Sequence, residues 1–193
     1  ILETNIFKGG FIGVDIFFVI SGYLITKIIV NDIHKNNFSI FNFFERRARR
    51  ILPLLLFVCL FFFIIGILIL RGDYLQEFIN TILSSIFFYS NYFFLFKEVE
   101  YGANQNLINP FIHTWSLSIE EQYYILFPIL IIFFKKRFNW LKFIIPVIFL
   151  TSFLLCIYGY SNYPKINFFL FSSRIWEILL GSILAIFPQF RLK

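Results

Sequence analysis

The chain has 193 residues, of which 59% are hydrophobic and 31 are phenylalanine, and its mean hydropathy is +0.79. A soluble domain of this length has too much surface to bury so many apolar side chains, so the composition indicates a membrane protein. The formal net charge is +6, but Lys and Arg gather between apolar runs, which is typical of membrane topology and not of nucleic-acid binding. Cys59 and Cys156 lie within apolar runs, which favours neither a disulfide nor a metal site.

Six apolar segments of about 18 to 20 residues follow one another, each long enough to cross a bilayer as a helix. Backbone groups facing lipid must be satisfied within their own segment, and the strand alternation of a barrel is absent, so we predict helices. The expected fold is an all-α, polytopic membrane helix bundle, with residues 1–193 as part of a single transmembrane domain. The absence of Met and the abrupt ends lead us to expect a fragment. The six segments are residues 11–30, 52–70, 78–96, 115–134, 143–160 and 168–187.

The basic residues between these segments predict how the chain is threaded. Residues 31–50 carry five Lys or Arg and residues 135–142 carry four. These two stretches would face opposite sides if all six segments crossed, against the tendency of basic loops to stay in the cytoplasm. Five or six segments therefore cross, and residues 78–96, rich in Asn, Ser and Thr, are either re-entrant, buried in the bundle, or a normal span that departs from the charge rule.

Five charged residues lie at membrane depth, where a charge costs about 2.5 to 3.5 kcal/mol and so marks a candidate site. Arg174 and Glu177 have i,i+3 spacing and can form a structural pair on one helix face. Asp15 is either a site residue or a solvated residue near the interface. Glu120 and Glu121 point about 100° apart on a helix, so at least one of them needs water or a partner.

Two further groups carry potential chemistry. The run at residues 45–50 is either a cytoplasmic anchor or an anion site, since Arg47 and Arg50 share a helix face and could grip a phosphate. His113 precedes the two carboxylates and could transfer a proton, whereas His34 lies in a polar loop.

Four strings of the sequence follow one another in order: GGFIGVDIFFVISGYLIT at 9–26, RRARRILP at 46–53, HTWSLSIEEQYYILFP at 113–128 and SRIWEILLGSILA at 173–185. Together they resemble landmarks of the acyltransferase-3 family of bacterial O-acetylases of lipopolysaccharide, peptidoglycan and exopolysaccharide. The resemblance implies transfer of an acyl group, usually acetyl, from cytoplasmic acyl-CoA to a hydroxyl of a surface glycan or lipid-linked saccharide, in the inner (cytoplasmic) membrane, with no bound cofactor or metal. It implies that Arg47 and Arg50 hold CoA, and that Ser116 and Glu121 form the family's Ser-x-x-x-x-Glu element.

The family's proposed catalytic His lies upstream of the Gly-Gly-Phe string, so we expect this chain to be inactive alone. We assign supporting catalytic roles to Glu121, Asp15 and His113, all expected toward the outer side together with Glu120. The predicted structural polar residues are Ser116, Glu120, Arg174 and Glu177. The alternative functions are a lipid-linked glycan transporter or flippase, which needs no thioester, and a non-catalytic membrane subunit.

Overall fold

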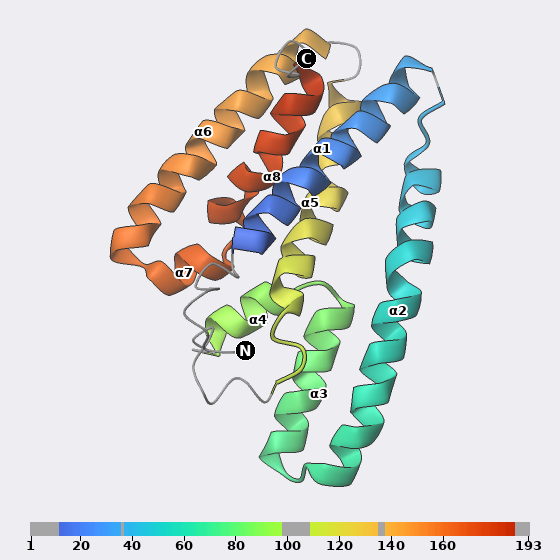
Figure 1. Ribbon diagram of the computed structural model, residues 1–193, viewed down its shortest axis with the longest axis vertical. Coiled ribbons are helices and arrows are strands. Elements are labelled where there is room, and N and C mark those ends of the chain that lie inside the picture. The colour runs from blue at the N-terminus through green and yellow to red at the C-terminus, as the bar shows by residue number, and fades with distance from the viewer. Residues whose placement is uncertain (1–11, 36, 98–108, 135–137, 188–193) are drawn as a thin grey trace.

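The computed structural model describes residues 12–35, 37–97, 109–134 and 138–187, and all secondary structure in these ranges is α-helical (Figure 1). The predicted all-α bundle is confirmed. Its helices are α1 (Ile12–His34), α2 (Ile40–Ile69), α3 (Asp73–Ile86), α4 (Ser90–Phe96), α5 (Thr114–Phe133), α6 (Phe138–Asn162), α7 (Pro164–Phe169) and α8 (Phe171–Ile186).

In the described part of the chain, four helices are long and apolar enough to cross a membrane: α1, α2, α5 and residues Trp140–Asn162 of α6. Their outer faces expose large apolar side chains, such as Phe57 and Leu68 of α2, which are 67% and 78% exposed. Such a continuous apolar surface is stable in lipid and not in water. The chain is therefore a multi-pass membrane protein.

The predicted segment 78–96 does not form one spanning helix. It is divided between α3 and α4, whose 14 and 7 residues reach only about 21 and 10 Å, short of the roughly 30 Å hydrocarbon core. The helix breaks at residues 87–89, where Phe88 has a φ of 54°. Hence the alternative that this segment is an ordinary continuous span is wrong, and the chain turns back within the bundle.

Because of this turn, α1 ends and α2 begins at the same end of the bundle as the end of α5 and the start of α6 (Figure 1, top). The basic residues of α2 and Lys142 of α6 lie toward this end, which we call the basic end; residues 135–137 fall outside the described ranges. The arrangement agrees with the threading predicted from loop charge.

Two other helix boundaries differ from the prediction. The second helix begins at Ile40 and not near residue 52, capped by Ser39, whose hydroxyl accepts a hydrogen bond from the backbone N–H of Asn42 at 3.4 Å. Arg47 and its neighbours therefore lie on the helix and not before it. The sixth segment is interrupted at Leu170, whose extended backbone separates α7 from α8.

Helices α1 and α8 form the tightest contact of the bundle. A Cβ atom added to Gly22 would lie 1.9 Å from the carbonyl oxygen of Ile178, and one added to Gly181 would lie 1.9 Å from that of Val19. The two backbones thus touch, as small residues allow between membrane helices. This contact fixes the charged residues of α1 and α8 relative to one another.

A buried polar network holds the break between α3 and α4 against α5. Ser90 shares hydrogen bonds with Ser118 at 2.7 Å and with Thr114 at 3.0 Å. Gln122 donates to the carbonyl of Phe88 and to the side-chain oxygen of Asn91, both at 2.9 Å. The backbone freed by the break is satisfied by protein, which allows irregular structure at membrane depth.

Candidate functional site

Arg47 reaches from the start of α2 into the bundle and lies over a ring of α5. Its guanidinium carbon is 4.3 Å from the centroid of the Tyr124 ring, a cation–π contact. The Tyr124 hydroxyl donates a hydrogen bond to the carboxylate of Glu120, one helical turn earlier on α5. The three side chains join the basic segment of α2 to a carboxylate that is only 5% exposed.

Glu121, the next residue of α5, differs from Glu120 in its hydrogen bonding. It is 9% exposed, and its Oε1 is buried without a hydrogen-bond partner among the described residues. Of these two adjacent buried carboxylates, Glu120 is bonded to Tyr124 and Glu121 retains an unused acceptor oxygen.

The other arginines of the run do not join this group. Arg46 pairs with Asp32 at 3.2 Å and Arg49 with Glu45 at 2.7 Å, on exposed surface. Arg50 is exposed and has no ion pair within the described part of the chain. The predicted pair is thus split between Arg47, half-buried against α5, and Arg50 on the surface of α2.

A second charged group, formed by Asp15, Arg174 and Glu177, joins α1 to α8. Arg174 Nη1 donates to Glu177 Oε1 at 2.6 Å and to Asp15 Oδ1 at 3.2 Å. The predicted pairing of Arg174 with Glu177 is confirmed, and Asp15 is not simply solvated. The guanidinium also lies over the ring of Phe168, at 5.1 Å from its centroid.

His113 and Ser116 lie at the start of α5. His113 is exposed at the N-cap position, and the Ser116 hydroxyl donates to its carbonyl at 3.1 Å. Ser116 therefore uses its donor locally and not on Glu121. The seven residues from His113 to Glu120 correspond to about 10 Å of helix, so His113 lies about two helical turns before Glu120.

The carboxylates expected together on the outer side are divided between the two groups. Glu120 and Glu121 lie near Arg47 of α2, whereas Asp15 lies with Arg174 on α8. The threading that placed them all toward the outer side gave no information on which helix each carboxylate would face.

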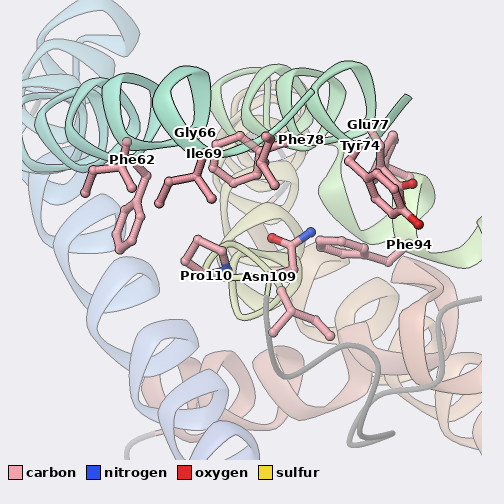
Figure 2. A pocket seen from close by; sticks show the side chains of 13 residues that line it. Phe62, Gly66, Ile69, Tyr74, Glu77, Phe78, Phe94, Asn109 and Pro110 are labelled. Carbon is pink, nitrogen blue, oxygen red and sulfur yellow. The ribbon is translucent and has the colours of Figure 1, made fainter. Parts of the chain in front are cut away.

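An apolar pocket of about 380 Å³ lies apart from both groups, between α2, α3, α4 and the segment before α5. Figure 2 shows Phe62 and Ile69 of α2 facing Pro110 across it. None of the residues singled out from the sequence lines this pocket. Its walls are formed by Phe62, Ile65, Gly66, Ile69, Leu70, Tyr74, Glu77, Phe78, Phe93, Phe94, Asn109, Pro110 and Ile112.

Comparison with known proteins agrees with these landmarks. The model of the acyltransferase-3 family, described as an acyltransferase domain, matches residues 3–193. The chain belongs to this family. No solved structure matches it.

Several relatives of this acyltransferase-3 chain have descriptive names. It is 36% identical over 200 residues to the O-acetyltransferase OatA of Staphylococcus aureus, covering 100% of this chain and 32% of that protein. It is 37% identical over 203 residues to a putative O-acetyltransferase, SACOL0978, of the same species, covering 100% and 33%. It is 37% identical over 183 residues to an uncharacterized protein of Haemophilus influenzae, covering 90% and 74%. The chain spans about a third of the length of the two named O-acetyltransferases.

Sequence reasoning missed two residues that organise this acyltransferase-3 domain. Tyr124 links Arg47 to Glu120, and Gln122 bridges the break in the α3–α4 segment. For Tyr124 a signal exists, since it follows Glu120 by four residues and so shares its helix face. For Gln122 the signal is weaker, since it is one of several polar residues of α5 and its position does not indicate that it faces the α3–α4 break. Among the described residues, no group of three or more His, Cys, Asp or Glu could hold a metal ion.

Proposed function

We propose that this chain is part of a membrane O-acyltransferase that moves an acyl group, acetyl in the first instance, from cytoplasmic acyl-CoA to a hydroxyl of a cell-surface glycan. The observation that carries the proposal is the Arg47–Tyr124–Glu120 contact, with the unused Oε1 of Glu121 beside it. Membership of the acyltransferase-3 family and the names of its relatives support the reaction class.

The donor is expected to approach at the basic end, which faces the cytoplasm if basic segments stay inside, as they do in a bacterial cytoplasmic membrane. CoA carries phosphates, and guanidinium groups bind phosphate with paired, charge-assisted hydrogen bonds. Arg50 is exposed and unpaired within the described chain, and Arg47 is half-buried beside it, so the two could bind different parts of one elongated donor.

In the transfer itself, the glycan hydroxyl attacks the thioester carbonyl, the new ester C–O bond forms, and the C–S bond breaks to release the CoA thiol. A general base takes the hydroxyl proton, which finally resides on the thiol. The resemblance implies that this base is a histidine upstream of the Gly-Gly-Phe string. Glu121, with an unused buried oxygen, is suited to orient such a group or a bound hydroxyl.

The test is acetyl transfer by the full-length protein in proteoliposomes that contain labelled acetyl-CoA and a glycan acceptor. Arg47→Ala and Arg50→Ala should each raise the KM for acetyl-CoA more than about tenfold, because each removes a charge-assisted bond. The matched control is Arg49→Ala, since Arg49 is exposed and pairs only with Glu45.

If both Arg47→Ala and Arg50→Ala keep the wild-type KM for acetyl-CoA, the two arginines only fix the orientation of the protein in the membrane. Glycan movement without consumption of acetyl-CoA would favour a flippase. Unchanged glycan acetylation on deletion of the full gene, with no transfer by the wild-type protein, would leave a non-catalytic subunit.

A further inference from the structure

Glu177 is a deeply buried carboxylate with only one of its oxygens in use. Its residue is 1% exposed, and Oε1 accepts the 2.6 Å hydrogen bond from Arg174. Oε2 is also buried and has no hydrogen-bond partner among the described residues. Since buried polar atoms in native proteins are nearly always hydrogen-bonded, this oxygen is available to a donor from outside the described residues.

The charges around Glu177 favour such a donor. The group contains two carboxyl groups, those of Asp15 and Glu177, but only one guanidinium, so Arg174 can compensate the charge of only one of them. Arg174 cannot readily turn toward Oε2, because it is also bonded to Asp15 and donates from Nε to the carbonyl of Phe168 at 3.4 Å. A buried carboxylate held in this way is stabilised by an incoming O–H or N–H group.

Exposure within the group falls from Asp15 through Arg174 to Glu177. The Asp15 side chain is 41% exposed and that of Arg174 is 18% exposed, whereas that of Glu177 is 2% exposed. Asp15 lies in the first turn of α1 and Arg174 near the start of α8, so the group lies away from the basic end (Figure 1). A ligand would enter past Asp15, from the side opposite the proposed donor entry.

We propose that this group is the subsite that binds the acceptor hydroxyl, with Glu177 Oε2 accepting the hydrogen bond from the hydroxyl of the glycan. Arg174 is a positioning residue that holds Glu177, and Asp15 holds Arg174. The inference rests on the proposed acyl transfer and adds to it a place for the acceptor. An imidazole or hydroxyl elsewhere in the longer protein could instead donate this hydrogen bond to Glu177 Oε2. Enzyme kinetics distinguish a donor on the protein from a donor on the glycan.

The experiment uses the full-length protein with labelled acetyl-CoA and a soluble glycan acceptor, and measures the acceptor KM, kcat and the Kd for acetyl-CoA. Glu177→Gln should raise the acceptor KM by roughly 10- to 100-fold, because the charge-assisted bond is lost, while the Kd for acetyl-CoA stays unchanged. The matched control is Glu77→Gln, which breaks the 3.2 Å ion pair with Lys97 away from this group and should leave the acceptor KM unchanged. A fall in kcat with an unchanged acceptor KM would assign Oε2 to a protein group and overturn the proposal.

A triple variant separates binding from a structural role of the group. Removing Arg174 alone leaves two uncompensated carboxylates, whereas replacing all three members with neutral residues removes every charge from the group. If the group only joins α1 to α8, Asp15→Asn combined with Arg174→Gln and Glu177→Gln should restore the acceptor KM, and that result would overturn the proposal. If Glu177 binds the acceptor, the triple variant should accumulate normally, bind acetyl-CoA normally and keep the raised acceptor KM.

The wild-type protein distinguishes this inference from the proposed function. Absence of acetyl transfer by the wild type would count against acyl transfer itself. Transfer by the wild type together with an unchanged acceptor KM in Glu177→Gln would count against the subsite alone.

Discussion

Two adjacent glutamates on α5 differ more in their surroundings than their sequence positions suggest. Glu120 accepts a hydrogen bond from the Tyr124 hydroxyl, whereas Glu121 Oε1 is buried without a partner in the described chain. A buried acceptor that has no structural partner is free to serve a ligand or a reacting group. From this difference we expect a functional role for Glu121 and a scaffolding role for Glu120.

We expect Glu121→Gln to reduce acetyl transfer by one to several orders of magnitude without lowering the amount of protein in the membrane, the effect of removing an acid/base or orienting group. Glu120→Gln should do less, because the amide oxygen of glutamine can still accept the Tyr124 hydrogen bond. The measurement is the rate of glycan acetylation per amount of purified full-length protein. Full activity of Glu121→Gln would defeat the assignment.

Residue pairing is also where sequence reasoning reached its limit. Helical spacing was enough to predict that Arg174 pairs with Glu177, since both lie on one face of one helix. It could not predict that Asp15 would join them, because that contact depends on how α1 crosses α8. For the same reason the cation–π contact of Arg47 with Tyr124 was beyond the sequence.

At the scale of helices, the contact of α1 with α8 depends on two glycines. Both face a backbone carbonyl so closely that any side chain would force the helices apart. Gly13, on the same helix as Gly22, has nothing within 4 Å of an added Cβ. Glycines of α1 therefore differ in what they contribute to the bundle.

We predict that Gly22→Ala and Gly181→Ala each lower the free energy of unfolding by about 1 to 3 kcal/mol, the usual cost of overpacking. Gly13→Ala should be neutral or slightly stabilising, since alanine favours a helix by up to about 1 kcal/mol over glycine. Thermal unfolding of the three purified variants in detergent provides the comparison. Equal midpoints for Gly181→Ala and Gly13→Ala would show that the helices can separate without cost.

Helix existence was predictable, but several helix ends were not. Apolar runs of spanning length located most helices, because lipid imposes a length and a composition on each span. The break at Phe88 has no local signal, since a phenylalanine rarely adopts a positive φ, and the break at Leu170 involves neither Gly nor Pro. The imbalance of basic loops and the polar side chains of residues 78–96 indicated the first of these two interruptions.

For the whole molecule, the turn at the α3–α4 break determines which ends share a side of the membrane. The segment between α1 and α2 and the start of α6 lie at the basic end, and the end of α6 lies at the other (Figure 1). This arrangement also separates the proposed donor arginines from the Asp15–Arg174–Glu177 group.

Single cysteines should report this threading directly. After replacement of Cys59 and Cys156, a cysteine at Asn37 or at Lys142 should react with an impermeant thiol reagent only from the cytoplasmic side. A cysteine at Asn162 should react only from the outside. All three positions are exposed. Labelling of Asn37→Cys and Lys142→Cys from opposite sides would refute the turn.

The ion pair between Asp15 and Arg174 also sets a condition on how the protein is made. The two residues are 159 positions apart, so at roughly 5 to 20 residues per second the ribosome needs about 8 to 32 seconds to supply the arginine after the aspartate. During that interval the aspartate has no cationic partner from α8. Asp15 lies in the first turn of α1, so we expect its carboxylate to stay hydrated near the membrane surface until α8 is inserted, and α1 to reach its final depth only then.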